Sequence, residues 1–200
     1  MCRLDVARAS LFVCDLQAKF RPLIHNVETV LVRSALCVRA AKELSMPVVT
    51  TEQYSKVFGH TIDALAAHLP ASPPVFEKTL FSMLTPDVRA CMDSNSGGSG
   101  VGGGERDQVV IVGIEAHVCV LHTVLDLLAD GKEVHVVSDA VSSQRPHDRE
   151  AALQRMSQAG AVITTSESML FDLLRDARHP HFRACSGLLK EANAAATWEE

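Results

Sequence analysis

The chain has 200 residues, of which 47% are hydrophobic and 22% are charged, a composition that predicts one soluble domain with its own hydrophobic core. Lys and Arg total 19 against 24 Asp and Glu, and the formal net charge of −5 disfavours nucleic acids and anionic membranes as partners. The N-terminal segment lacks the apolar core of a signal peptide, and no apolar run is long enough to cross a bilayer, so we expect a cytoplasmic protein.

The first predicted strand is an apolar run at residues 11–14 that ends at Asp15. In open α/β sheets, ligands bind at the carboxyl ends of the strands, which makes this carboxylate a candidate site residue. Residues 16–22 have the composition of a loop. In residues 26–44 the apolar positions recur at helical spacing, which predicts a long amphipathic helix.

Two more strands are predicted before the middle of the chain. The first covers residues 47–51 and is followed by a short predicted helix at 61–69. The second is brief, at residues 75–76, and leads to Lys78. Lys78 is therefore another polar side chain at the carboxyl end of a predicted strand.

A helix is predicted from Pro86 to about Met92, with Thr85 as its N-cap. Residues 94–104 are rich in Gly and Ser and carry too little apolar surface to order themselves, so we expect a flexible insertion. Three of its glycines match the dinucleotide-binding fingerprint, but that loop must follow a strand and open a helix, whereas this one precedes a strand. Because the alternation of strands and helices then resumes, we expect a single domain over residues 1–200 and no cofactor.

In residues 108–130 a predicted strand is followed by a predicted helix, and a cysteine lies where the strand pattern changes to the helix pattern. Residues 109–112 are apolar and β-branched without polar alternation, which predicts a strand buried on both faces. From His117 the apolar residues recur at helical spacing until Gly131, which is suited to a left-handed C-cap. Cys119 thus lies in the first turn of a predicted helix, where the partial positive charge of the N–H groups favours a thiolate.

The six cysteines show no Cys-x-x-Cys pair and no regular spacing, which argues against a zinc ribbon and a disulfide framework. We expect all of them to be reduced thiols. A lone cysteine most often packs as a small hydrophobic residue, so the nucleophile hypothesis for Cys119 depends on partners elsewhere in the chain. The cysteines stand at positions 2, 14, 37, 91, 119 and 185.

The last third of the chain predicts two further strands, at residues 134–139 and 161–165, separated by a helix. A helix at 167–174 follows, with Ser166 as its expected cap, and beyond residue 181 the polar, alanine-rich tail is expected to fray. Six strands alternate with helices without clear hairpin signals. This order predicts a three-layer αβα fold with a six-stranded, mostly parallel, Rossmann-like sheet.

Three reactive side chains, Asp15, Lys78 and Cys119, fall at predicted strand ends. The segments that contain them read Phe-Val-Cys-Asp-Leu-Gln at 12–17, Phe-Glu-Lys-Thr-Leu-Phe-Ser-Met at 76–83, and Gly-Ile-Glu-Ala-His-Val-Cys-Val at 113–120. In their order and placement they resemble the isochorismatase-like, or cysteine hydrolase, superfamily, which includes nicotinamidases and carbamoylsarcosine amidases. The resemblance covers nearly the whole chain except the insertion and the two ends. It is closest to the small isochorismatase-domain proteins of eukaryotes, whose Thr-Glu-Gln-Tyr segment is present at 51–54.

The resemblance implies the isochorismatase-like hydrolase fold and a role for each reactive side chain. Cys119 would be the nucleophile, Asp15 the base that takes its proton and returns it to the leaving group, and Lys78 the cation that keeps the thiolate charged. A carbonyl substrate would pass through a thioester that water then hydrolyses. The family pattern also implies a cis Ile114–Glu115 peptide bond and an oxyanion hole made by the backbone N–H groups of Glu115 and Cys119.

The metal site of the nicotinamidases has no counterpart in this sequence. Those enzymes use an Asp-x-His pair after the second strand, whereas this chain has Glu52, Gln53 and Tyr54 there and only His60 follows, so we expect no metal. Lone histidines such as His60 and His117 are most often surface or packing residues. The candidate substrate-binding residues are Gln17, Phe20, Gln53, Tyr54 and Phe81.

The leading hypothesis is a metal-independent cysteine hydrolase of a small amide or related C–N bond, acting through a Cys119 thioester. Isochorismatase itself cleaves a vinyl ether without a cysteine, so Cys119 favours the amidase-like branch. The alternative is a non-catalytic binding or scaffold protein that retains the fold. A nuclease is disfavoured by the net charge and by the lack of an evident carboxylate cluster for two-metal chemistry. The expected partners are a small-molecule substrate and, from the family, further copies of the chain.

Overall fold

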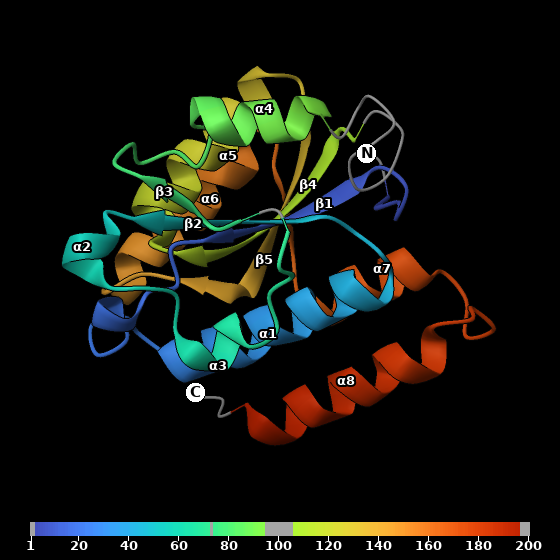
Figure 1. Cartoon of the computed structure of the whole chain (residues 1–200). Helices are drawn as coiled ribbons and strands as arrows, with labels where there is room; N and C mark the ends of the chain where they lie inside the picture. The colour runs from blue at the N-terminus through green and yellow to red at the C-terminus, as the bar shows by residue number, and fades with distance from the viewer. Residues whose placement is uncertain (1–2, 73, 95–105, 197–200) are drawn as a thin grey trace.

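One parallel sheet forms the centre of the molecule (Figure 1). The computed structural model describes residues 3–72, 74–94 and 106–196, and over these residues every neighbouring strand pair is parallel. The six strands stand in the order β3-β2-β1-β4-β5-β6, which confirms the predicted six-stranded three-layer fold. The expected flexible insertion at 94–104 lies outside the described residues except for Ser94, the last residue of a helix. The strands are β1 (Ala9–Cys14), β2 (Val48–Gln53), β3 (Phe76–Lys78), β4 (Gln108–Ile114), β5 (Glu133–Ser142) and β6 (Val162–Thr164).

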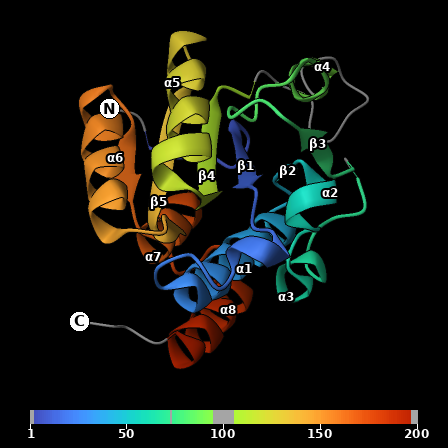
Figure 2. The same ribbon diagram turned by 90° about the vertical axis from the view of Figure 1, so that its left-hand side faces the viewer.

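Helices cover both faces of this sheet, as the two views in Figures 1 and 2 show. On one face lie α1 (Val27–Glu43), α3 (Asp63–Ala66), α7 (Ser166–Leu174) and α8 (Phe182–Ala195). On the other lie α4 (Pro86–Ser94), α5 (Leu121–Ala129) and α6 (Pro146–Gln158). Three short turns follow strand ends: η1 (Ala18–Phe20) after β1, α2 (Ser55–Phe58) after β2 and the π-helical turn η2 (Ala116–Val120) after β4. None of the helices in the described part of the chain combines the length and the apolarity that a membrane span requires.

Side-chain alternation along the central strands divides the core between the two faces. In β1, Leu11 and Val13 pack against the α1 side, whereas Phe12 and Cys14 pack against the α5 side. Both faces are covered, and for this reason the central strands are uninterrupted apolar runs. The alternation directs the Cys14 side chain to the face on which η2 and α5 lie.

From Phe182 to Ala195 the C-terminal segment is a helix, so the expectation that the chain frays beyond residue 181 is wrong over these residues. Helix α8 packs along α1, and Leu189 is buried in the contact. Arg33 Nη1 donates a hydrogen bond to Asn193 Oδ1 at 2.7 Å across the same contact. The tail composition suggested a solvated segment, but its apolar residues fall on one helical face, and α1 supplies the surface that covers them.

Helix α7 begins one residue earlier than expected, and Thr165 is its N-cap. The Thr165 hydroxyl accepts a hydrogen bond from the Ser168 backbone N–H at 3.2 Å. Ser166, the expected cap, instead donates its hydroxyl to Asp139 Oδ2 at 2.7 Å. Asp139 lies on β5, so its availability as a partner depends on the tertiary structure. The helix expected at residues 61–69 is also shorter, since α3 covers only Asp63–Ala66.

Gly113 is required where β1 and β4 run side by side. Its φ is +121°, which L side chains rarely adopt, and a Cβ there would overlap the Cys14 carbonyl oxygen and lie 2.7 Å from the Cys14 nitrogen. We predict that Gly113→Ala lowers the free energy of unfolding by about 3 kcal/mol, because backbone strain and overpacking add. Urea denaturation measures this change. The control is Gly187→Ala in α8, where a Cβ meets no atom within 4 Å; an equal loss in both variants would contradict the prediction.

Candidate active site

Asp15, Lys78 and Cys119 lie at the carboxyl edge of the sheet, each contributed by a different strand end. Asp15 directly follows β1, Lys78 is the last residue of β3, and Cys119 lies in η2. Strand β1 neighbours β4 directly, but β2 stands between β1 and β3, so the long Lys78 side chain extends past β2. The structure therefore brings together the three residues that the sequence singled out.

Lys78 and Asp15 form a buried ion pair. Lys78 Nζ lies 2.6 Å from Asp15 Oδ2, and the two side chains are 0% and 2% exposed. The ammonium also donates to Gln53 Oε1 at 2.6 Å and approaches the carbonyl oxygens of Leu80 and Phe81 at 3.1 Å. A buried charge is tolerated only when it is paired and hydrogen-bonded, and these contacts meet that requirement.

The electrostatic surroundings keep Lys78 protonated. Burial by itself lowers the pKa of the Lys78 ammonium, but the neighbouring Asp15 and Cys119 groups raise it, and the net pKa is above the ordinary lysine value. Lys78 is therefore a fixed cation between a carboxylate and two thiols. A cation in this position stabilises negative charge on sulfur.

Cys119 is almost buried, with 8% of its surface exposed. The turn that contains it is π-helical, where the sequence predicted the first turn of an α-helix. π-helical turns are rare and frequently occur at functional sites. Thr123 donates its hydroxyl to the Cys119 carbonyl oxygen at 2.6 Å and accepts from the Met83 N–H at 2.9 Å. This hydroxyl ties the cysteine turn to the segment that follows Lys78.

A second thiol lies in the core on the same side of the sheet as Cys119. Cys14, the last residue of β1, is fully buried in that core. Burial raises the pKa of the Cys14 thiol well above its usual value, and the nearby Cys119 and Asp15 groups raise it further. Cys14 is thus held as a protonated thiol.

The turn after β4 has the backbone form that the family resemblance implied. The Ile114–Glu115 peptide bond is cis. The Glu115 carbonyl oxygen accepts hydrogen bonds from the N–H groups of Val118 and Val120, both at 3.1 Å. The Glu115 carboxylate accepts from the Gln144 backbone N–H at 3.0 Å and from its side-chain amide at 3.1 Å. Glu115 therefore bonds to η2 through its backbone carbonyl and, through its carboxylate, to Gln144 just before α6.

The five candidate substrate-binding residues differ in position. Gln53 contacts Lys78 directly. Gln17 is fully buried, and its amide bonds the Gln53 backbone N–H at 2.7 Å and the Gly59 carbonyl at 2.6 Å, so it anchors a loop. Phe20 stacks on Phe58 with ring centroids 4.7 Å apart. The exposed members are Tyr54 at 46% and Phe81 at 54%.

Two contacts of the cluster were missed from the sequence. Thr51 donates its hydroxyl to Asp15 Oδ1 at 2.7 Å, which leaves each Asp15 oxygen with a defined partner. Thr51 belongs to the segment quoted for the family resemblance, so it could have been found there. Thr123 could have been found from its spacing, since a hydroxyl four residues after Cys119 on a helix can bond the Cys119 carbonyl.

Glu52 and His60 are the residues that the sequence comparison set against the metal pair of the nicotinamidases, and the two side chains are in contact. The Glu52 carboxylate accepts from the Thr61 N–H at 2.6 Å, the Thr61 hydroxyl at 2.7 Å and His60 Nδ1 at 2.9 Å. Burial raises the pKa of Glu52, but these donors outweigh it and the net pKa is lowered. Among the described residues, no group of three or more potential ligands could hold a metal ion. The metal-free reaction stays a prediction.

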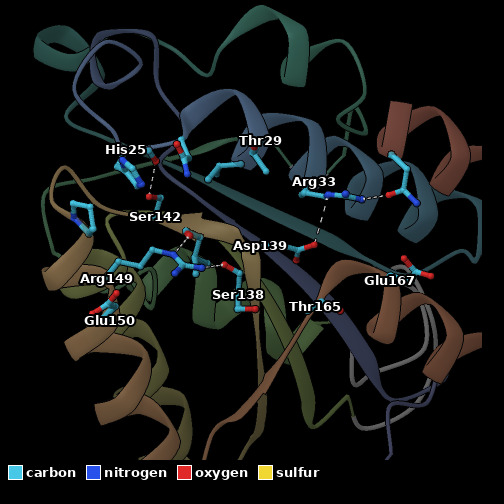
Figure 3. A pocket seen from close by; sticks show the side chains of 15 residues that line it. His25, Thr29, Arg33, Ser138, Asp139, Ser142, Arg149, Glu150, Thr165 and Glu167 are labelled. Carbon is cyan, nitrogen blue, oxygen red and sulfur yellow. Dashed lines mark hydrogen bonds and ion pairs between the residues drawn. The ribbon is translucent and has the colours of Figure 1, made fainter. Parts of the chain in front are cut away.

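A cavity of about 810 Å³ is lined by residues of α1, β5 and α6 (Figure 3), and Cys119 is not among them. Two arginines that line this cavity contact neighbouring groups of the protein. Arg33 lies 3.6 Å from Asp139, and Arg149 donates a hydrogen bond to the Val141 carbonyl oxygen at 2.9 Å. These contacts join α1 and α6 to β5. We assign them to holding the helices on the sheet, because Asp15, Lys78 and Cys119 are not among the lining residues.

An all-parallel sheet with this cluster at its carboxyl edge defines the class of isochorismatase-like α/β folds. The isochorismatase domain model matches residues 9–168, and the chain belongs to the isochorismatase family.

Among its relatives is a secreted isochorismatase effector, Isc1, of Phytophthora sojae, which is 45% identical over 90% of this chain and 84% of its own length. Isochorismatase domain-containing protein 2 of Xenopus laevis is 42% identical over 90% of this chain and 83% of its own length. A solved structure titled MAR1 ribonuclease, from Caenorhabditis elegans, is 40% identical and has a TM-score of 0.88, covering 100% of this chain and 98% of that one.

Proposed function

We propose that the chain is a metal-independent cysteine hydrolase that cleaves a small amide or related C–N bond. The observation that carries this proposal is the buried ion pair between Lys78 and Asp15, 2.6 Å apart, in electrostatic contact with Cys119. A buried ion pair usually stabilises a fold no more than well-packed hydrophobic residues of similar volume would, so stability alone does not explain a buried lysine beside these cysteines. Activation of the Cys119 thiolate does explain it.

In the proposed reaction, Asp15 takes the Cys119 proton and the thiolate attacks the substrate carbonyl carbon. The carbonyl oxygen becomes an oxyanion that accepts hydrogen bonds from the backbone N–H groups of Glu115 and Cys119. As the intermediate collapses, the C–N bond breaks and Asp15 returns the proton to the leaving nitrogen. Water then attacks the Cys119 thioester with Asp15 again as base, which releases a carboxylic acid and restores the thiol. Lys78 stays charged throughout.

We further propose that Gln53, Tyr54 and Phe81 contact the substrate, because Gln53 adjoins Lys78 and the two aromatic side chains are exposed. Gln17 and Phe20 would act on substrate binding by holding the same loop. Self-association and a cytoplasmic location are also part of the proposal. Size-exclusion chromatography with light scattering tests the first, and fractionation of cells that express the chain tests the second.

Thiol reactivity tests the activation of Cys119 before any substrate is known. We predict that Cys119 is alkylated faster at neutral pH than the other cysteines, and that Lys78→Ala and Asp15→Ala slow it selectively, because each removes part of the activating cluster. Peptide mass spectrometry of iodoacetamide-treated protein across pH gives the rate at each site. Cys91, which is half-buried on α4, is the internal reference. If Cys119 reacts no faster than Cys91, the non-catalytic binding or scaffold alternative is favoured instead.

The name of the nematode relative supplies a second candidate, RNA cleavage, since the two chains are 40% identical. The net charge of −5 disfavours it, because phosphate binding needs a positive surface. The test is incubation of wild-type and Cys119→Ala protein with single-stranded and duplex RNA. Cleavage that both proteins carry out equally would come from a contaminant or another site, whereas cleavage lost with Cys119 would replace the amidase proposal.

A further inference from the structure

The hydroxyl of Thr123 bonds two segments that the proposed hydrolysis uses, although Thr123 has no assigned part in that reaction. Thr123 lies on α5, four residues after Cys119, and its side chain is 0% exposed. The hydroxyl donates to the Cys119 carbonyl oxygen at 2.6 Å and accepts from the Met83 backbone N–H at 2.9 Å. One buried oxygen atom therefore links the turn of the candidate nucleophile to a segment 40 positions earlier in the chain.

The segment that contains Met83 also holds the Lys78 cation. The Lys78 ammonium approaches the carbonyl oxygens of Leu80 and Phe81, both at 3.1 Å. Met83 follows two residues after Phe81, and its side chain is fully buried. The bond from the Met83 N–H to Thr123 therefore fixes the end of the segment whose carbonyls surround the ammonium.

Stability of the helix does not by itself explain a threonine at this position. A hydroxyl that bonds the carbonyl four residues earlier slightly destabilises a helix and often bends it, and threonine is a weaker helix former than alanine. The hydroxyl does satisfy the buried Met83 N–H, and loss of that bond would cost stability. A role in the reaction must therefore be separated from this structural role by measurement.

We propose that Thr123 is a positioning residue, whose hydroxyl fixes the Cys119 turn relative to the Lys78 ammonium. The inference rests on the proposed function, because the groups that it aligns are the proposed thiolate and its cation. The Cys119 N–H is also a proposed oxyanion donor, so a bond to the carbonyl of the same residue restrains that donor as well. Thr123 contacts no reacting atom, and we expect its effect in the chemical step. A misplacement of about 1 Å at a reacting centre can cost on the order of 10²-fold in rate.

The test compares wild type with Thr123→Val, which keeps the shape of the side chain but loses the hydroxyl, and with Thr123→Ser, which keeps the hydroxyl. Iodoacetamide alkylation of Cys119 in the full chain is measured at neutral pH by peptide mass spectrometry, with Cys91 as the internal reference. We expect the Cys119 rate to fall about tenfold in Thr123→Val and to stay within about twofold of wild type in Thr123→Ser. The Cys91 rate should not change in either variant.

The matched control is Ser166→Ala, which removes another fully buried hydroxyl. Ser166 donates to Asp139 Oδ2 at 2.7 Å, so the lost bond joins α7 to β5 and involves no residue of the proposed site. Ser166→Ala should leave the Cys119 alkylation rate at the wild-type value. Urea denaturation and circular dichroism of every variant show how much of each protein is folded under the conditions of alkylation.

A second comparison tests whether Thr123 acts through Lys78. In the Lys78→Met background, Thr123→Val should change the Cys119 rate by less than about twofold, because no cation remains to be aligned. Thr123→Ala loses the same hydroxyl and replaces the valine variant in both backgrounds if valine prevents folding. The inference would be overturned by a loss of stability with an unchanged Cys119 rate, by equal slowing in Thr123→Val and Thr123→Ser, or by the same tenfold effect with and without Lys78.

The wild-type rate distinguishes a failure of this inference from a failure of the proposed function. If wild-type Cys119 reacts no faster than Cys91, the activated thiolate is absent and the positioning role is lost with it. If wild-type Cys119 reacts fast and Thr123→Val leaves it unchanged, the hydrolase stands and the role of Thr123 does not. With an amide that wild type hydrolyses, Thr123→Val should lower kcat about tenfold with KM within about threefold, and Thr123→Ser should restore kcat.

Discussion

Cys119→Ala is expected to lower kcat for an amide substrate by on the order of 10⁴-fold or more, because the covalent route is lost and only binding and the oxyanion hole remain. The fold should be retained, because the change removes a single sulfur atom and adds none, although the buried position makes a small loss of stability expected. The measurement is steady-state turnover over a panel of small primary amides and carbamoyl compounds. For any amide that wild type hydrolyses, kcat is compared between the two proteins.

Two further variants sharpen this result. Cys91→Ala removes a half-buried thiol on α4 and should leave turnover unchanged. Cys119→Ser keeps a nucleophilic atom, but an alcohol is far harder to deprotonate than a thiol, so turnover should stay close to that of the alanine variant. Equal turnover by wild type and Cys119→Ala would reject Cys119 as the nucleophile.

Lys78→Met should lower the free energy of unfolding by about 3 to 5 kcal/mol, because it leaves the buried Asp15 carboxylate without its cation. The two side chains are 0% and 2% exposed, so water cannot replace the lost partner without a rearrangement. Methionine keeps a long apolar side chain, which limits the cavity that the change creates. Urea denaturation at constant pH measures the loss, with the slope checked for two-state behaviour.

The matched control is Lys56→Met, which alters an exposed lysine in α2 and should change stability by less than about 0.5 kcal/mol. The double variant Asp15→Asn with Lys78→Met removes both charges and should recover part of the lost stability. Amide turnover should stay lost in the double variant, because both roles in thiolate formation are gone. A Lys78→Met loss no larger than that of Lys56→Met would mean that the ion pair contributes little to the fold.

The main features of the fold could be predicted from the sequence because they depend on local patterns. Apolar runs such as residues 109–112 predict strands buried on both faces, and helical spacing predicts α1 and α5 to within a few residues. Parallel strands end at one edge of a sheet, so polar residues that follow different strands are brought to the same edge. Asp15, Lys78 and Cys119 could be singled out in this way, with the family resemblance supplying their roles.

The contacts within the site could not be predicted, because they depend on register and on packing between distant segments. Lys78 meets Asp15 across 63 positions of sequence, and this requires both the strand order and the length of the lysine side chain. Gln17 was expected at a pocket wall but is buried against the backbone of a neighbouring loop. A local pattern carries no information on such distances.

By itself, the sequence determined the succession of strands and helices along the chain, and it placed Asp15, Lys78 and Cys119 at strand ends. Both follow from the spacing of residue types along the chain. Only the tertiary structure decided that α8 docks on α1, that Lys78 and Asp15 form a buried pair, and that the Thr51 hydroxyl bonds the second Asp15 oxygen. The reason is that burial and short side-chain distances arise when segments pack, and packing is a property of the whole chain.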